Sequence, residues 1–479
     1  MNQSQFRDYC AAGPILLDGA TGTHLQQAGM PTGTSPEMWV IDHPDVLADL
    51  QSSYLQAGCS ILYAFTFGAN RIKLAGHGIG ADPCTALNIQ LARISLDVRD
   101  RWMAGANAPD SASAWHNWTS GRPVLVAGDL APTGQFLMPA GDLTFEELVD
   151  IYYEQALGLF QAGVDLFVIE TMIDLAQTRA AVLAIQSVCD LPIMASLTFE
   201  ENGRTLTGNP PLPSLLALAS LGVAAFGINC SFGPDKLAEL LTPLQKISPV
   251  PLLVKPNAGM PHLINGKTVF PMDANAFAAA MKPMLAAGIS LLGGCCGTGP
   301  DHIAAIARLA AAAVAPKASG SNPAASAANL ASADGGLACA DCLPWSRMIG
   351  SSRQVWIVDT DSRLPVLICK QPADLEQLAD LVDDQPDAVI IDLTGCASQN
   401  LDNLFLVTFN EMQSMLAAPL IFRDHSLPRL KNLLRAYHGR AGLQIVSDAD
   451  QVILSDLQSY FYPYDPVFIL DQESLSCSS

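Results

Sequence analysis

The stretch Leu291-Leu292-Gly293-Gly294-Cys295-Cys296-Gly297-Thr298 places two adjacent cysteines among three glycines at the end of an apolar run. In a regular strand, adjacent side chains point to opposite faces, so neighbouring thiols reach one centre only where the backbone is irregular. Glycine allows such irregularity because it adopts positive φ without steric cost. A third cysteine, Cys230, ends another apolar run, Phe226–Cys230. Three thiolates converging from two strand ends predict a soft metal site suited to zinc, with one coordination position open for a substrate thiol.

Short apolar runs alternate with segments of helical character from residue 14 onward. Continuous apolar strands separated by amphipathic helices predict a parallel sheet that is buried on both faces. Eight such units before residue 313 predict an α/β fold, a closed (β/α)8 TIM barrel over residues 1–312, with a doubly wound open sheet as the structural alternative. The predicted strands are Ile15–Gly19, Ile61–Phe67, Val124–Gly128, Leu166–Thr171, Ile193–Thr198, Phe226–Cys230, Leu252–Asn257 and a run ending at Cys295.

The best-marked helix follows Thr144. A threonine cap with Glu147 three positions later is the capping-box pattern, and Gly163 is a suitable end before the fourth strand. The last barrel helix is expected to begin at Asp301.

Composition changes abruptly after the predicted barrel. Residues 313–339 are dominated by alanine, serine, glycine and proline, which predicts a flexible linker. Residues 340–479 predict a smaller α/β domain, too short for a second barrel of about 250 residues. Its expected elements are strands at Val355–Val358, Val366–Ile368, Ala388–Leu393 and Leu420–Phe422, and a helix at Leu427–Leu434.

The net charge and the number of cysteines limit the binding partners and the cellular compartment that we expect. The formal net charge of −21 argues against nucleic acid and anionic membranes as partners. The N-terminus lacks the pattern of a signal peptide, and no uninterrupted apolar run of about 18 residues predicts a membrane span. Twelve cysteines without a secretory signal indicate reduced thiols and metal ligands, so the expected compartment is the cytoplasm.

Polar residues stand where several predicted strands end, which is where barrels of this kind carry their active sites. Asp18 and Glu170 suit the ammonium of an amino-acid substrate, and backbone N–H groups from Gly19 through Thr21, or after Cys230 at Ser231, suit its carboxylate. Zinc coordination would deprotonate a substrate thiol whose free pKa is about 8.5. Further strand-end candidates for substrate contact are Asn229 and Asn257.

Each of these residues also has a simpler interpretation. The Cys295–Cys296 pair alone is equally consistent with core thiols, because buried cysteine behaves as a small hydrophobe. Asp18 is a possible helix cap, Glu170 a possible partner of an arginine, and Asn257 a possible turn residue. The addition of Cys230, the glycines and the barrel pattern favours the metal site.

The barrel resembles the zinc-dependent homocysteine S-methyltransferases over about residues 10–312, nearest to the homocysteine module of cobalamin-dependent methionine synthase. The resemblance implies zinc on Cys230, Cys295 and Cys296, and homocysteine near Asp18 and Glu170, with Asn257 a fourth ligand that substrate displaces. The matching segments are Leu17–Thr23, Pro132–Gly134, Gly141–Glu147, Ile169–Thr171, Glu201–Gly208, Gly227–Cys230, Lys255–Gly259 and Gly293–Thr298.

The chain also departs from that family of methionine synthases. It contains no Asp-x-His-x-x-Gly cobalamin signature, and residues 340–479 resemble only part of a folate-binding barrel. The expected methyl donor is therefore methylcobalamin on a separate corrinoid protein, or a methylated small molecule such as S-methylmethionine or betaine. Two alternatives stay open: a subunit of a catabolic corrinoid system acting on another thiol or methylated compound, and a non-catalytic zinc scaffold or sensor.

Overall fold

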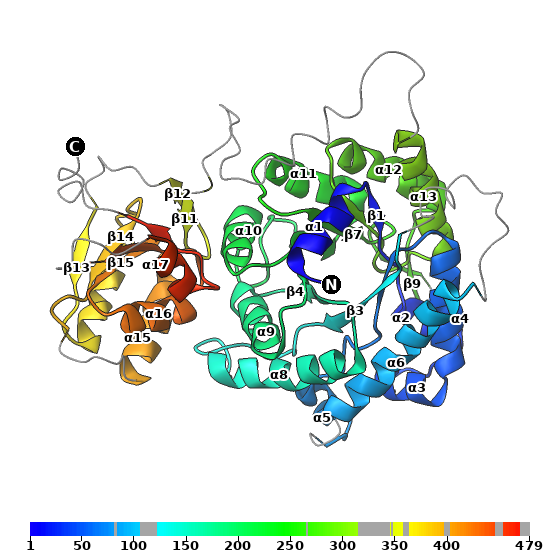
Figure 1. Ribbon diagram of the computed structural model, residues 1–479, viewed down its shortest axis with the longest axis horizontal. Helices are drawn as coiled ribbons and strands as arrows, with labels where there is room; N and C mark the ends of the chain where they lie inside the picture. The colour runs from blue at the N-terminus through cyan, green and yellow to red at the C-terminus, as the bar shows by residue number, and fades with distance from the viewer. Residues whose placement is uncertain are drawn as a thin grey trace, which may run out of the picture. The chain divides into compact units, whose positions relative to one another are not determined.

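The computed structural model describes residues 1–80, 84–105, 122–264, 267–314, 345, 348–357, 364–396, 403–445 and 454–469 (Figure 1). The chain divides into two compact units, Met1–Gly203 with Val223–Ala340, and Arg204–Gly222 with Asp341–Ser479. The predicted linker lies outside the described residues except for its first two positions. Domain boundaries at 312 and 340 therefore stay predictions.

Eight parallel strands form one sheet in the order β1-β10-β7-β6-β5-β4-β3-β2, around which helices lie on the outside (Figure 1). A parallel bridge between Leu17 and Ile61 joins the two ends of this sheet, and the Ser60 N–H donates to the Leu16 carbonyl at 2.8 Å beside it. The predicted (β/α)8 barrel is thus confirmed. Its strands are β1 (Ile15–Leu16), β2 (Ile61–Tyr63), β3 (Leu125–Leu130), β4 (Leu166–Met172), β5 (Ile193–Leu197), β6 (Ala225–Cys230), β7 (Leu252–Pro256) and β10 (Leu291–Leu292).

Helix α8 (Phe145–Ala162) shows how local sequence sets the helix ends. The Thr144 hydroxyl accepts from the Glu147 N–H, and the Glu147 carboxylate accepts from the Thr144 N–H, so the predicted capping box is confirmed. Gly163 ends the helix at φ 94°, a conformation that favours glycine. The other helices of residues 1–314 are α1 (Gln3–Ala11), α2 (Gly22–Gln27), α3 (Pro36–Asp42), α4 (Pro44–Gln56), α5 (Arg71–Gly76), α6 (Cys84–Met103), α9 (Leu175–Val188), α10 (Pro211–Ser220), α11 (Pro234–Gln245), α12 (Ala274–Ala286) and α13 (Pro300–Val314).

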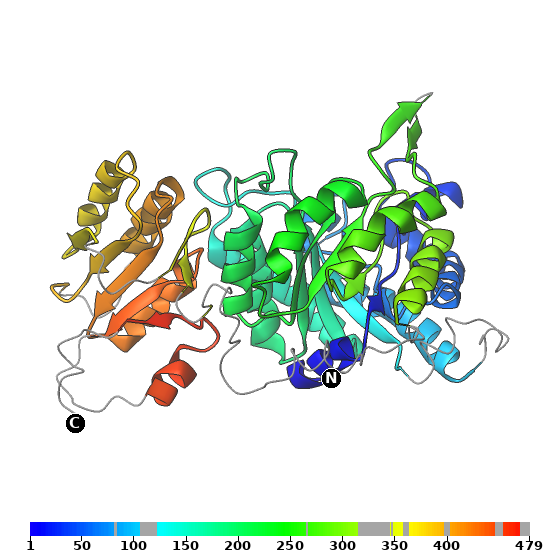
Figure 2. The same cartoon turned by 90° about the horizontal axis from the view of Figure 1, so that it is seen from above.

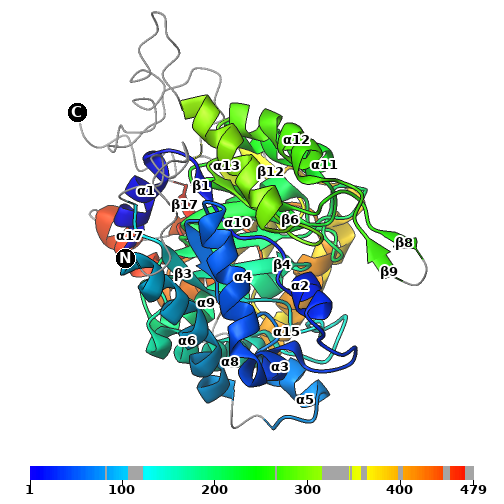
Figure 3. The same cartoon turned by 90° about the vertical axis from the view of Figure 1, so that its right-hand side faces the viewer.

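The amino-terminal helix closes one end of the barrel. Phe6, Tyr9 and Cys10 of α1 pack in one buried cluster with strand residues from the barrel interior. Figure 2 shows α1 at this end, and Figures 2 and 3 show the antiparallel hairpin of β8 (His262–Ile264) and β9 (Lys267–Val269) projecting elsewhere from the barrel. Because α1 fills the end where strands begin, the opposite end is left for a site.

The second unit is α/β, as predicted, and contains a five-stranded parallel sheet in the sequential order β13-β14-β15-β16-β17. The four expected strands and the expected helix are present, whereas the short strands β11, β16 and β17 were not predicted. Its elements are β11 (Met348–Gly350), β12 (Val355–Ile357), β13 (Val366–Ile368), η3 (Pro372–Leu381), β14 (Val389–Asp392), α15 (Asn403–Met415), β15 (Leu420–Asp424), α16 (Leu427–Ala436), β16 (Gly442–Ile445), α17 (Leu454–Phe461) and β17 (Val467–Phe468).

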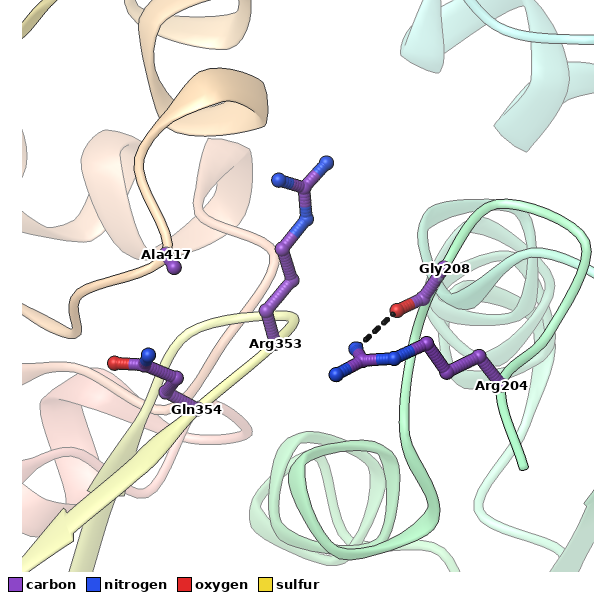
Figure 4. A pocket seen from close by; sticks show the side chains of 5 residues that line it. All are labelled: Arg204, Gly208, Arg353, Gln354 and Ala417. Carbon is purple, nitrogen blue, oxygen red and sulfur yellow. Dashed lines mark hydrogen bonds between the residues drawn. The ribbon is translucent and has the colours of Figure 1, made fainter. Parts of the chain in front are cut away.

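A hollow within this unit is lined by Arg204, Gly208, Arg353, Gln354 and Ala417. Figure 4 shows the Arg204 guanidinium turned toward the Gly208 carbonyl oxygen, to which it donates at 3.0 Å. This arginine is therefore held by its own loop.

Among the described helices, none combines the length and the hydrophobicity that crossing a membrane requires.

We expect Gly227→Ala to destabilise the barrel. A Cβ at this position of β6 would lie 2.1 Å from the Leu253 carbonyl oxygen of β7, and both strands are interior members of the sheet. The free energy of unfolding should fall by about 3 kcal/mol in urea denaturation. Gly76→Ala is the matched control, since a Cβ there meets nothing within 4 Å. Equal effects of the two substitutions would contradict the packing described for β6 and β7.

Candidate active site

Three cysteine sulfurs converge where β6 and β10 end. The Sγ atoms of Cys230, Cys295 and Cys296 all lie within 4.8 Å of one another. Tetrahedral zinc with sulfur ligands at about 2.3 Å separates those sulfurs by roughly 3.8 Å, so the spacing fits such an ion. The donor set is soft as well, which favours zinc over magnesium or calcium.

Strand β7 lies between the two cysteine-bearing strands and anchors both. Cys230 is in register with Pro256 of β7, and the Cys295 N–H donates to the Pro256 carbonyl at 2.7 Å. The Ala258 N–H, just beyond β7, donates to the Cys296 carbonyl at 2.9 Å. The end of β7 therefore fixes the positions of all three cysteines along the barrel axis.

Adjacent thiols require an irregular backbone, which the sequence predicts at the three glycines around them. The structure shows positive φ at only one of these glycines. Gly297 has φ 79°, but the other left-handed residues are Cys230 at φ 59° and Ser231 at φ 64°. A Cβ on Gly294 would lie 2.3 Å from the Thr298 hydroxyl oxygen, and one on Gly293 would lie 2.9 Å from the Asp18 carbonyl. Gly293 and Gly294 thus serve close packing, and the expectation of positive φ holds for Gly297 alone among the three glycines.

Gly297 also makes room for an aromatic ring. A Cβ there would lie 2.2 Å from Phe270, which directly follows β9. The loop that carries Cys295 and Cys296 is therefore packed against the base of the projecting hairpin.

The pKa values of the three thiols differ widely because the thiols hydrogen-bond one another. Hydrogen bonds from Cys295 and Cys296 lower the pKa of Cys230 to about 3. The same interactions raise the pKa of Cys295 well above its usual range and contribute to a pKa of about 11 for Cys296. One negative charge is stable in this cluster, and a bound cation would relieve the repulsion that opposes a second and a third.

Asn257 lies beside the thiols rather than on a cavity wall. Its side chain hydrogen-bonds Cys230, which lowers the pKa of that thiol. Its backbone N–H donates to the Phe232 carbonyl at 3.0 Å. The buried Asn257 Oδ1 has no hydrogen-bond partner within the described part of the chain. These contacts suit either a ligand oxygen or a partner that orients Cys230.

A cavity of about 290 Å³ adjoins the thiols at this end of the barrel. Its wall includes seven of the predicted site residues, whereas Asn229, Ser231 and Asn257 do not contribute to it. The seven are Asp18, Gly19, Thr21, Glu170, Cys230, Cys295 and Cys296.

Asn229 and Ser231 instead fix strand ends. The Asn229 Oδ1 accepts from the Thr171 N–H and from the Ser196 hydroxyl, each at 2.8 Å, and its amide donates to the Thr171 hydroxyl at 2.7 Å. These bonds hold Thr171, the neighbour of Glu170, at φ 58°. The Ser231 hydroxyl accepts from the Phe199 N–H at 2.9 Å. Direct substrate contacts by Asn229 and Ser231 stay predictions.

Asp18 is tied to a lysine that was not predicted as a site residue. The Lys255 Nζ lies 2.7 Å from the Asp18 Oδ1 and 3.6 Å from the centre of the Tyr63 ring, and the Tyr63 N–H donates to the Asp18 Oδ2 at 2.8 Å. The Asp18 carboxylate therefore orients Lys255, and Thr21, not Asp18, is the N-cap of α2. A lysine inside an apolar strand run was the available signal for this pair.

Glu170 interacts with Lys255 at a longer distance than Asp18 does. Its Oε2 lies 3.9 Å from the Lys255 Nζ and, within the described residues, accepts no hydrogen bond. Burial raises the pKa of Glu170 to about 7, against the lowering effect of Lys255; Asp18 and Cys230 raise it further. Near neutral pH this carboxyl group is therefore poised to ionise when a cation arrives.

Two further acidic residues of the cavity were missed. Asp129 in β3 lies one residue beyond the predicted third strand and lines the same cavity as Glu170. Glu37 of α3 accepts from the Gly68 N–H at 2.8 Å and is therefore already partnered. Helix α3 is remote in sequence from any strand end, so no local pattern marked Glu37.

We expect Lys255→Met to lower the free energy of unfolding by about 3–5 kcal/mol, because it leaves the buried Asp18 carboxylate without its partner. Lys236→Met is the matched control: Lys236 pairs with Glu239 at 3.0 Å on the exposed surface, where removal should cost less than about 1 kcal/mol. Urea denaturation of both variants measures the difference. Similar losses would show that the buried pair is not what stabilises this wall.

The sequence is similar to a known protein family. The sequence pattern of the homocysteine S-methyltransferase family matches residues 15–310. The methionine synthases of Mycobacterium leprae and Mycobacterium tuberculosis are 34% and 32% identical over 305 residues, which is 61% of this chain and 24% of each of those proteins. This chain thus spans about a quarter of the length of these relatives.

Solved structures agree on the fold. The homocysteine methyltransferase MmuM from Escherichia coli, in its metallated and oxidized forms, aligns with TM-scores of 0.52 and 0.51 at 24% and 23% identity. Each alignment covers 62% of this chain and 96% of the other. The sequence match over residues 15–310 includes Cys230, Cys295 and Cys296, and it covers the whole barrel sheet. The chain belongs to the homocysteine S-methyltransferase family.

Proposed function

We propose that the barrel transfers a methyl group to the thiol of homocysteine and forms methionine, with zinc held by Cys230, Cys295 and Cys296. The observation that carries this proposal is the convergence of three cysteine sulfurs within 4.8 Å at the edge of a cavity whose lining residues include carboxylates with an oxygen that receives no hydrogen bond from the described residues. The name of the mycobacterial relatives, methionine synthase, supports methionine as the product.

The reaction forms one bond and breaks one. The homocysteine sulfur attacks the methyl carbon, the S–CH3 bond forms, and the bond between methyl and donor breaks with its electron pair left on the donor. Zinc held by three thiolates would supply a centre that lowers the pKa of the substrate thiol and retains its sulfur. The thiol proton passes to solvent before transfer, so no protein acid or base is needed in the methyl-transfer step.

The remaining residues would position the amino-acid part of the substrate. Glu170, which lines the cavity and has an oxygen that receives no hydrogen bond from the described residues, is the stronger candidate to bind the ammonium, because the Asp18 carboxylate already binds Lys255 at 2.7 Å. Backbone N–H groups of the turn at Gly19 and Thr21 border the same cavity and suit the carboxylate. Asn257, beside Cys230, would complete the metal site until the substrate sulfur replaces it.

For the methyl donor we propose methylcobalamin carried by a separate corrinoid protein, with a methylated small molecule as the other source. A panel of methylcobalamin, S-methylmethionine and betaine, each with homocysteine and zinc-loaded full-length protein, distinguishes these donors. Turnover of another thiol in preference to homocysteine would favour a catabolic methyl-transfer subunit. No turnover with any donor, together with a tight protein partner, would favour a scaffold.

Cys296→Ala tests the metal assignment. Removal of one of three sulfurs should reduce zinc content well below one ion per chain and methyl transfer by about 100-fold or more. Cys189→Ala is the control, because Cys189 follows α9 and does not line the cavity. Zinc analysis and methionine formation are measured on both; full zinc and undiminished transfer in Cys296→Ala would refute the site.

Binding of the product should depend on pH through Glu170. As pH rises through about 7, Glu170 loses its proton and gains the charge that attracts an ammonium, so the Kd for methionine should fall between about pH 6 and pH 8. Methionine is the suitable ligand because its sulfur carries no titrating proton. Calorimetric titration should show this dependence in the parent protein and lose it in Glu170→Gln; an identical pH dependence in both would exclude Glu170.

A further inference from the structure

The backbone of Asp129 is fixed by hydrogen bonds, whereas one oxygen of its carboxylate receives none from the described residues. The Thr66 hydroxyl donates to the Asp129 carbonyl at 2.7 Å, the Gln155 amide donates to the same oxygen at 3.3 Å, and the Asp129 N–H donates to the Thr66 hydroxyl at 3.2 Å. The residue is only 4% exposed and lines the cavity. Its Oδ1 finds no hydrogen-bond donor among the residues that the structure describes.

The cavity wall carries more negative than positive charge. Asp18, Glu37, Asp129 and Glu170 contribute four carboxyl groups, of which Glu37 already accepts from the Gly68 N–H, and Lys255 is the one cation among the described lining residues. Lys255 binds Asp18 at 2.7 Å and lies 3.9 Å from Glu170, so its positive charge is balanced mainly by the Asp18 carboxylate. Burial, followed by the nearby Glu170 carboxylate, raises the pKa of Asp129 well above its usual range, against the lowering effects of Lys255 and Lys73.

Lys73, a lysine outside the wall, attracts the Asp129 carboxylate but donates no hydrogen bond to its Oδ1. The Lys73 ammonium lies 4.4 Å from the centre of the Phe67 ring and 3.5 Å from the Phe67 carbonyl oxygen. Lys73 is not among the lining residues of the cavity. Asp129 therefore lies on the cavity wall with one buried carboxylate oxygen that receives no hydrogen bond from the described residues.

We propose that Asp129 determines substrate specificity: it recognises the primary ammonium of the thiol substrate, so that thiols bearing this group are preferred over otherwise identical thiols that lack it. This inference rests on the proposed methyl transfer to a thiol. An ammonium has three N–H donors, and two residues of the cavity wall each have a buried carboxylate oxygen that receives no hydrogen bond from the described residues, Asp129 Oδ1 and Glu170 Oε2. Cys230 borders the same cavity, so one small molecule would reach the sulfurs and these oxygens together.

The test compares homocysteine with 4-mercaptobutyrate, which keeps the thiol, the carbon chain and the carboxylate but has hydrogen in place of the ammonium. Zinc-loaded full-length protein, Asp129→Asn and the control Asp142→Asn, at an exposed position before α8, are assayed with the donor that supports turnover. We expect Asp129→Asn to lower kcat/KM for homocysteine on the order of 100-fold and to change that for 4-mercaptobutyrate less than about threefold. Asp142→Asn should change neither.

The outcomes separate this inference from the proposed function. If the parent protein methylates homocysteine and Asp129→Asn affects both thiols equally, or neither, the specificity role is wrong and the methyl-transfer proposal stands. If no donor supports turnover, calorimetric binding of homocysteine decides: weaker binding by Asp129→Asn supports the role, and equal binding or no binding to the parent protein overturns it. Asp129→Ser replaces Asp129→Asn in both assays should the asparagine variant lose zinc or unfold.

Discussion

The convergence of three sulfurs on one point is the constraint on which the rest of this site depends. No regular strand presents adjacent residues to the same side, so the chain leaves regular geometry at Cys230, Ser231 and Gly297. The barrel makes this possible because β7 lies between β6 and β10 and holds both cysteine-bearing ends through Pro256. Left-handed backbone at non-glycine residues is costly, and two of the five described residues that adopt it are Cys230 and its neighbour Ser231.

Excess negative charge links the sulfur cluster to the cavity beside it. Thiolates repel one another, and the carboxyl groups of Asp18, Asp129 and Glu170 share a buried space with a single internal ammonium, that of Lys255, among the described lining residues. Burial raises the pKa of Asp129 and Glu170, and bound cations would favour the ionised form of this wall. A soft metal ion suits the sulfurs, and an ammonium suits the oxygens. The two binding tasks proposed for the barrel are thus separated by the chemistry of the donors, although the donors lie side by side.

Much of the barrel could be predicted from the sequence because its strands are continuous apolar runs and its site residues stand where those runs end. The cysteines were recognisable for the same reason, since thiols beside glycines at two strand ends are typical of a metal site. Lys255 and Asp129 were not singled out, because one polar residue inside an apolar run does not reveal which partner lies across the barrel. The strands β16 and β17 escaped prediction because Gly442–Ile445 includes a glycine and a glutamine and Val467–Phe468 spans only two residues, so neither forms a continuous apolar run.

The contact between Gly297 and Phe270 has a consequence for how this barrel varies. The aromatic ring occupies the volume that any side chain at position 297 would need, so the sulfur-bearing loop and the arm formed by β8 and β9 are complementary in shape. Neither partner tolerates enlargement without displacement of the other. Phe270, at the base of the arm, and residues 293–298 therefore form a matched pair, and an exchange of the arm together with Phe270 between homologous barrels would preserve the thiol arrangement only if the loop were exchanged with it.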